Sequence, residues 1–248
     1  MSVAFGNAKT VWSGIRSRQR SERQVQTRFK KACSILFLRT SVLCCLSVLS
    51  AFSEANSDNN AERQEYLSRL SAARSAYFRV IVSNDEAADS QAHAALAAFA
   101  REYPDDAVGK AYRGSLELLD AAHSWRIWNL HRQSAEGLRL LDEAVAQAPD
   151  EPEARFIRAA TDWHLPGFYH RKAQCEADFA LLAGRAESDV RAGRLPPELG
   201  AAALSYWGQI LLGRRDAAGA KTAFATAVRV APQSPGGLDA ERRLGRLK

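Results

Sequence analysis

The segment from Ala201 to Ser234 has the spacing of two helices that pack against each other along their length. Two antiparallel helices approach closely only where side chains are small, and apolar residues three, four and seven positions apart form one helix face. Counted from Ala201, the residues that fit this scheme are Gly208 at position 8, Ala220 at 20, Phe224 at 24, Ala227 at 27 and Pro232 at 32. We therefore expect a helical hairpin over 201–234, ended by Pro232, which has no N–H to continue a helix.

The residues Gly213–Asp216 separate the two halves of this hairpin. Glycine readily takes the left-handed conformation that closes a helix, and aspartate is a favoured residue at the start of one. The sequence therefore predicts that Gly213 ends the first helix in a left-handed conformation and that Asp216 caps the second.

Two other prolines, Pro104 and Pro149, each follow an amphipathic segment in the same way. When Pro149 is placed at position 32, positions 20, 24 and 27 are filled by Gly137, Leu141 and Ala144. When Pro104 is placed there, the same positions are filled by Ala92, Leu96 and Phe99. These weaker copies predict that further hairpins precede the C-terminal one.

The rest of the chain also has a helical pattern. Only Phe78–Val82 is rich in residues that favour strands, and its setting indicates the end of a helix. Helices are expected at Ala61–Val82, Ala87–Tyr103, Asp106–His123, Ile127–Gln147, Glu151–Trp163 and His170–Ala192, with a short capping helix at Leu238–Leu247. We expect an all-α domain over residues 56–248, built as a right-handed α-solenoid of three to four irregular hairpins.

The first 55 residues differ from the rest of the chain in composition. A basic stretch over residues 1–31 is followed by apolar residues, and the run Thr40–Phe52 has the length expected of a signal-peptide core. The small residues Ser53 and Ala55 predict cleavage after Ala55 and export to the periplasm or beyond. The alternatives are an inner-membrane anchor over Ala32–Phe52, in which Arg39 is costly, and a segment without a targeting role.

The basic charge of the chain is confined to this N-terminal segment. Residues 1–55 carry nine Lys and Arg against two Asp and Glu, a net charge of +7. Because the whole chain is +6, residues 56–248 have a net charge of −1. A charge balance of this kind argues against nucleic acid as a partner of the predicted mature domain.

The spacing of 201–234 resembles that of a tetratricopeptide repeat, whose period is about 34 residues. The region from Ala107 to Leu182 is similar to a family of small bacterial tetratricopeptide-like proteins, on the basis of SerTrpArgIleTrpAsnLeu at 124–130, AlaArgPheIleArgAla at 154–159 and HisLeuProGlyPheTyrHisArg at 164–171. The resemblance implies an export signal and a repeat fold, and it assigns no reaction and no functional residues.

The sequence contains no recognisable catalytic motif. It has no glycine-rich phosphate loop, no GlyXaaSerXaaGly motif and no pair of cysteines in metal-binding spacing. His164 and His170 are separated by a Pro-Gly break, so we expect a structured turn, with Phe168 and Tyr169 packed on the core, rather than a metal site. Cys175, the one cysteine after residue 55, is expected to be a packed helix residue. We expect no enzyme activity, no cofactor and no metal.

These features favour a non-catalytic adaptor that binds a protein or peptide in the bacterial periplasm or cell envelope. Aromatic and arginine side chains favour such binding, although Trp125, Trp128 and Trp163 could equally pack in the core. The expected partner-contact residues are Tyr112, Trp128, Arg132, Arg155 and Arg158. If that is so, replacement of Arg155 and Arg158 by glutamate abolishes partner binding and leaves the melting temperature nearly unchanged. The alternatives are a self-associating or membrane-tethered structural subunit and, with less support, an envelope enzyme or its accessory subunit.

Overall fold

The computed structural model describes residues 60–83, 85–123 and 127–247, with the side chains of 123–133 left out. The predicted signal segment, residues 1–55, lies outside the described residues. The chain divides into two units, Met1–Tyr66 and Leu67–Lys248. Of the first unit only residues 60–66 are described, and they are helical. All further statements concern the second unit.

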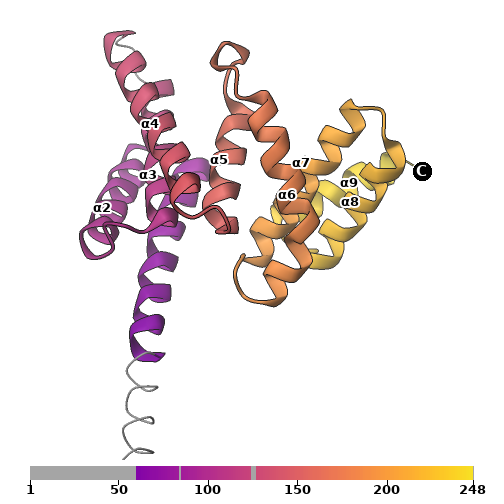
Figure 1. Ribbon diagram of the computed structural model, residues 1–248, viewed down its shortest axis with the longest axis horizontal. Helices are drawn as coiled ribbons and strands as arrows, with labels where there is room; N and C mark the ends of the chain where they lie inside the picture. Colours follow the sequence, from indigo (N-terminus) through magenta and orange to yellow (C-terminus); the bar gives the residue numbers. More distant parts are fainter. Residues whose placement is uncertain (1–59, 84, 124–126, 248) are drawn as a thin grey trace, which may run out of the picture. The chain divides into compact units, whose positions relative to one another are not determined.

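The described part of the chain is all-helical, as predicted, and contains no strand (Figure 1). Its first helix, here called the N-terminal helix, covers residues 67–83 of the second unit. The others are α2 (Glu86–Glu102), α3 (Ala107–His123), α4 (Ile127–Gln147), α5 (Pro152–His164), the short 3-10 helix η1 (Gly167–Tyr169), α6 (Lys172–Arg191), α7 (Pro197–Gly213), α8 (Ala217–Val230) and α9 (Pro235–Arg246).

Side-chain caps and prolines set several of the helix starts. Glu151 precedes α5, and its carboxylate accepts a hydrogen bond from the backbone N–H of Glu153. Ser234 precedes α9 and accepts from the N–H of Gly237, so that α9 begins at Pro235, three residues earlier than the sequence predicted. Proline fits the first turn of a helix because the N–H that it lacks would have no acceptor within the helix at that position. The polar residue and proline together explain the longer helix.

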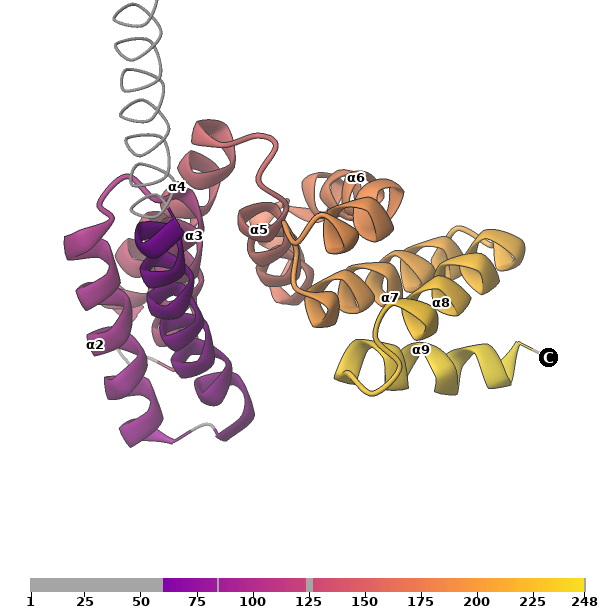
Figure 2. The same ribbon diagram turned by 90° about the horizontal axis from the view of Figure 1, so that it is seen from below.

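Each helix from α2 to α9 packs against the next one along the chain. In addition, α3 packs against α5, α5 against α7, and α7 against α9, so that alternate helices also meet. Helices α7, α8 and α9 lie side by side at the C-terminal end (Figure 2). Contacts are therefore made mostly between elements that are close in sequence.

The C-terminal hairpin forms where it was predicted. Ala220, Phe224 and Ala227 on α8 are completely buried, and Gly208 on α7 is buried opposite them. A Cβ atom at Gly208 would lie 2.5 Å from Cε1 of Phe224, which is closer than side chains in real structures approach. The absence of a side chain at Gly208 therefore lets the Phe224 ring pack directly against the backbone of α7.

The turn of this hairpin differs from the prediction in one respect. Gly213 is the last residue of α7 and has no positive φ, whereas Arg215 has a φ of 66° and takes the left-handed conformation. The prediction for Gly213 was therefore wrong. The glycine still has helical geometry, and the left-handed residue is Arg215, two positions later. The prediction for Asp216 is confirmed, since its carboxylate accepts a hydrogen bond of 2.8 Å from the N–H of Gly219.

The two weaker copies also select buried positions. The residues aligned on Pro104 and Pro149 are all buried, namely Ala92, Leu96, Phe99, Gly137, Leu141 and Ala144. Helices α3 and α4 cross closely at two glycines, because a Cβ at Gly114 would lie 2.8 Å from the carbonyl oxygen of Gly137. Small residues thus permit close helix packing in this hairpin as well.

None of the helices in the described ranges combines the length and the apolar composition needed to cross a lipid bilayer.

Substitution of Gly208 by leucine tests the packing of the last hairpin. We expect Gly208→Leu to lower the free energy of unfolding by about 1–3 kcal/mol or more, because the Phe224 ring has no room to move in the core. The matched control is Gly184→Leu on α6, where a Cβ meets nothing within 4 Å. This control should be neutral or slightly stabilising, since leucine favours helix more than glycine does. Urea unfolding of both variants measures the difference, and equal effects would contradict the packing.

Candidate functional site

Tyr112 is completely buried and does not offer a surface to a partner. Its hydroxyl donates a hydrogen bond of 2.8 Å to Oε1 of Glu153 on α5. Burial, followed by the nearby Glu153 carboxylate, raises the pKa of this phenol well above its usual value. The expectation that Tyr112 contacts a partner is therefore corrected, because the aromatic ring is part of the α3–α5 packing.

Glu153 joins three helices through its carboxylate. Arg74, on the N-terminal helix, donates from Nε and Nη2 to the two carboxylate oxygens at 2.7 Å each. Beside this pair runs a chain of hydroxyl groups, from Tyr77 to Ser115 at 2.7 Å and from Ser115 to Thr161 at 2.8 Å. The N-terminal helix, α3 and α5 are thus linked by polar contacts that are buried or partly buried.

Arg155 and Arg158 point towards α6, where both pair with Asp178. Arg158 donates to both oxygens of this carboxylate, from Nε at 2.8 Å and from Nη2 at 2.9 Å, and Arg155 donates from Nη1 at 2.6 Å. The side chains of the two arginines are 16 % and 11 % exposed, and that of Asp178 is 3 % exposed. Two arginines in this position hold α5 to α6, so we correct the expectation that replacing them leaves stability unchanged.

Trp128 and Arg132 lie in the first turns of α4, and their side chains are outside the part of the structure that is described. Their predicted role in partner binding stays a prediction.

A second arginine centre joins α4 to the start of α6. Arg171 donates from Nη1 and Nη2 to the two oxygens of Asp142 at 2.8 and 2.6 Å, and from Nε to Oδ1 of Asp162 at 3.0 Å. Gln174 donates to Oδ1 of Asp142 at 2.8 Å. Burial alone would raise the pKa of Asp142, but the hydrogen bonds from Arg171 and Gln174 outweigh it and lower the pKa. Asp142 therefore remains ionised well into the acid range.

The negative charge of Asp162 is compensated less completely than that of Asp142. Its side chain is completely enclosed, and its Oδ2 atom has no hydrogen-bond partner among the described residues, although Arg171 pairs with Oδ1. Burial raises the pKa of Asp162 to about 6, against the opposing effect of Arg171. A carboxyl group in this state changes its charge near neutral pH and affects the packing of α5 on α6.

A pocket of about 220 Å³ opens at the turn between α5 and α6. It is lined by Asp162, Trp163, Leu165, Pro166, Gly167, Arg171, Lys172, Cys175 and Glu176. Since the Asp162 carboxylate is enclosed, the polar groups that a ligand would meet belong to Arg171, Lys172 and Glu176. The indole of Trp163 and the residues of the turn supply an apolar wall.

Cys175 lines the pocket but is not a reactive nucleophile. Its thiol donates a hydrogen bond to the carbonyl oxygen of Ala159 at 3.3 Å, and the residue is 2 % exposed. Burial, with the nearby carboxylates of Asp162 and Asp178, raises the pKa of the thiol to about 12. Because the thiolate is the nucleophilic form, covalent chemistry at this sulfur is disfavoured. The prediction of a packed helix residue is confirmed.

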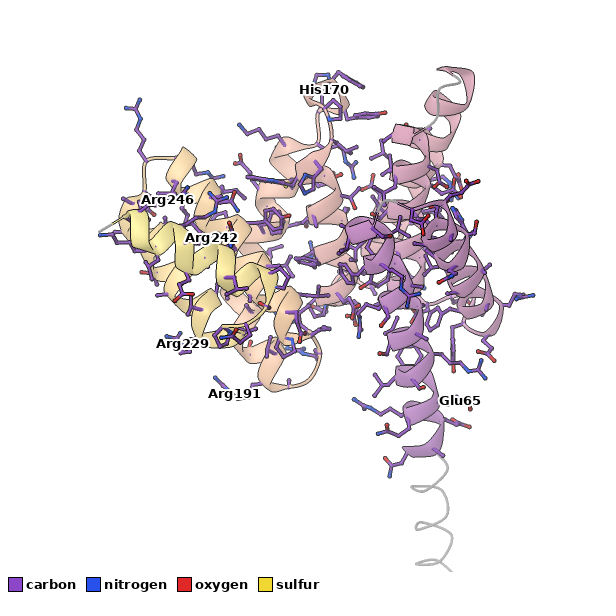
Figure 3. The ribbon with its side chains drawn as sticks, turned by 180° about the vertical axis from the view of Figure 1, so that it is seen from behind. Glu65, His170, Arg191, Arg229, Arg242 and Arg246 are labelled. Carbon is purple, nitrogen blue, oxygen red and sulfur yellow. The ribbon has the colours of Figure 1, made fainter. Side chains whose placement is uncertain are left out.

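Aromatic side chains lie exposed around the pocket. Trp163 is 36 % exposed and Phe168 is 70 % exposed, so the expectation that Phe168 packs on the core was wrong. Tyr169 does hold the turn, since its hydroxyl donates to Oγ of Ser134 at 2.9 Å. The turn that carries η1 and His170 projects from the ends of α5 and α6 (Figure 3). A protein surface with a tryptophan and a phenylalanine beside a pocket is typical of a binding site.

The two histidines of the turn are not brought together as a metal pair. The Nε2 atom of His164 lies 3.3 Å from the hydroxyl of Tyr206 on α7, and burial lowers the pKa of His164. His170 ends η1 with a φ of 56° and is exposed. The structured turn that was predicted between His164 and His170 does form, as the short helix η1.

A comparison with protein-family models, curated proteins and solved structures finds no match for this chain.

Removal of the Asp178 carboxylate tests the arginine pairing between α5 and α6. We expect Asp178→Ala to lower the free energy of unfolding by about 3–5 kcal/mol, because the largely enclosed Arg155 loses its carboxylate partner and Arg158 keeps only its 3.3 Å contact with Asp142. Glu143→Ala provides the control, since Glu143 pairs with Arg139 on the exposed side of α4 and should tolerate truncation. Thermal and urea unfolding followed by circular dichroism measure both. A loss no greater than that of the control would show that the pairing contributes nothing.

The enclosed carboxyl group of Asp162 predicts a characteristic pH dependence. Its pKa is about 6 in the folded chain and ordinary, about 3.9, in the unfolded one, so the folded state holds the proton more tightly. The stabilisation from this group is present below about pH 4 and is lost as the pH rises through about 6. Relative to Asp162→Asn, the wild type should lose up to about 3 kcal/mol of unfolding free energy between pH 4 and 7. Urea titrations at four pH values test this, and a constant difference would contradict it.

Proposed function

We propose that this chain is a non-catalytic helical-repeat protein, similar in organisation to tetratricopeptide-repeat proteins, that binds a protein or peptide partner. The observation that carries the proposal is the packing of alternate helices, α3 on α5, α5 on α7 and α7 on α9, in addition to each hairpin. In helical-repeat proteins each unit buries its apolar face against its neighbours in sequence. Among α2 to α9, contacts made with the next helix and the next but one are what such an arrangement requires, and the Arg74–Glu153 pair is a longer-range addition to them.

In this proposal α3–α4, α5–α6 and α7–α8 are the repeated hairpins of a right-handed α-solenoid, and α9 covers the last of them. The N-terminal helix and α2 would form a further hairpin, supported by the hydrogen bond from Arg79 to Gln91. The polar residues of α9 favour a terminal position, because the outer face of a capping element must be compatible with water. Arg242 and Arg246 on this helix are exposed (Figure 3).

The surface that supports binding best lies at the α5–α6 turn. Trp163 and Phe168 are exposed there, and the adjacent pocket has the size to accept one side chain of a partner. Tyr206 of α7 extends the aromatic surface, with its ring centre 5.4 Å from that of Trp163. Tryptophan and other aromatic residues contribute a large share of the energy of protein interfaces. The contact residues proposed here therefore replace the buried Tyr112 and the paired Arg155 and Arg158.

The proposed place of action is the periplasm or cell envelope, on the basis of the N-terminal sequence pattern alone. The charge balance of residues 56–248 supports a protein or peptide partner over nucleic acid. The enclosed thiol of Cys175 and the pairing of the buried carboxylates with arginines support a non-catalytic role.

Site-specific photo-crosslinking in cells tests the proposal. A photoreactive phenylalanine analogue is placed at Phe168, and in a second strain at Leu238 on α9, which is also exposed. We expect a discrete crosslinked product from position 168 and none from position 238. Trp163→Ala, combined with the analogue at 168, should reduce the product at least about tenfold if the tryptophan is an interface hot spot.

Two results would contradict the proposal. Equal products from the two positions would indicate non-specific contact, and the lack of any product from a folded protein would exclude this surface as the binding site. A product whose mass is twice that of the chain would instead identify self-association.

A further inference from the structure

Three metal-ligating side chains converge between α2 and α3, away from the α5–α6 turn. Asp89 and His93 lie four residues apart on α2, and residues at this spacing face the same side of a helix. Asp120 on α3 faces them, with its Oδ2 atom 2.8 Å from Nε2 of His93. The side chains of Asp89, His93 and Asp120 are 37 %, 42 % and 21 % exposed, so that one side of the group is open to solvent.

The separations of the three ligand atoms suit a single ion. Nε2 of His93 is 4.0 Å from Oδ2 of Asp89, and the ligand atoms of the three residues all lie within 4.8 Å of one another. A zinc ion binds imidazole nitrogen and carboxylate oxygen at about 2.0–2.2 Å, which requires its ligands to be no more than about 4.2 Å apart. These separations are close enough for small changes of side-chain rotamer to bring the three ligand atoms around one ion.

The carboxylates of this group are paired differently from the enclosed carboxylates of the molecule. Elsewhere in the described chain the enclosed carboxylates pair with arginine: Glu153 with Arg74, Asp178 with Arg158 and Asp189 with Arg194. Neither Asp89 nor Asp120 has a lysine or arginine partner among the described residues, and both approach the same nitrogen of His93. A neutral imidazole nitrogen can donate to only one of two carboxylates. Two carboxylates with no lysine or arginine partner among the described residues favour the binding of a metal cation.

We propose that Asp89, His93 and Asp120 form a binding site for a divalent transition-metal ion of the zinc type. One imidazole nitrogen and two carboxylate oxygens are borderline ligands that suit Zn²⁺ better than the all-oxygen sets preferred by Mg²⁺ or Ca²⁺. The solvent-exposed side leaves the fourth position to water or to a ligand from another molecule. This inference stands apart from the proposed binding function, because it uses residues of α2 and α3 only.

Bound zinc would act as a cross-link between α2 and α3. An ion that binds the folded chain and not the unfolded one stabilises the folded state in proportion to the logarithm of its concentration over the dissociation constant. Protons compete with the metal for the imidazole and the carboxylates, so the affinity should fall as the pH is lowered. The site therefore couples the stability of the α2–α3 contact to the metal content and pH of its surroundings.

Isothermal titration of the full chain with Zn²⁺ alone, without an affinity tag, tests the proposal. Cys33, Cys44 and Cys45 are also potential zinc ligands, so the test compares how much zinc binding each substitution removes. We expect one equivalent of zinc to be lost, or its affinity to fall at least about tenfold, in His93→Ala and in Asp120→Asn. His170→Ala, which removes an exposed histidine outside the group, is the matched control and should bind as the wild type does.

The melting temperature provides a second readout. Zinc at saturating concentration should raise it in the wild type and in His170→Ala, and the increase should be smaller in Asp89→Asn and Asp120→Asn, which keep the side-chain shape. Zinc binding by His93→Ala and by the two asparagine variants that equals that of the wild type, or no saturable binding by the wild type at all, would overturn the proposal.

Discussion

The packing of α5 depends on ion pairs on two of its faces. On one face the Glu153 carboxylate receives Arg74 and Tyr112, and on the other Arg155 and Arg158 enclose Asp178. Charges removed from water carry a large desolvation cost, which only close pairing offsets. If either set is broken, enclosed charges lose their closest partners, although Arg158 keeps its contact with Asp142. Helix α5 therefore contributes much of the connection between the N-terminal helices and the C-terminal hairpins, next to the pairing of Arg171 with Asp142 that joins α4 to the start of α6.

The ion pairs also fix how the helices are aligned. A guanidinium group presents its N–H donors in a rigid plane, so the two-point contact of Arg158 with Asp178 and that of Arg171 with Asp142 allow little sliding. Apolar packing is less selective, because neighbouring positions on a helix offer similar surfaces. The C-terminal hairpin achieves its alignment differently, through the insertion of the Phe224 ring at Gly208. One chain thus uses charge pairing in its middle and close packing at its end.

The sequence predicted most of the helices correctly, because prolines and capping residues mark helix ends and small residues mark close contacts between helices. The buried set Ala220, Phe224 and Ala227 could be predicted from spacing alone. The candidate site could not be, since the partner of Arg155 lies 23 residues away and a paired arginine looks like an exposed one in the sequence. Phe168 shows the opposite error: an aromatic residue in a turn was expected to pack inwards, yet its ring lies at the surface. Periodicity shows which face of a helix is polar, and only tertiary structure shows whether that polar face meets water or another charge.

Cys175 gives the α5–α6 contact a chemical property that the ion pairs lack. Its sulfur is almost fully buried beside the pocket and holds its proton, so oxidants and alkylating reagents react with it slowly until the helices part. The rate at which this thiol is modified in native conditions is then set by the frequency of that opening. The rate of Cys175 modification therefore measures how often α5 and α6 separate in the native protein.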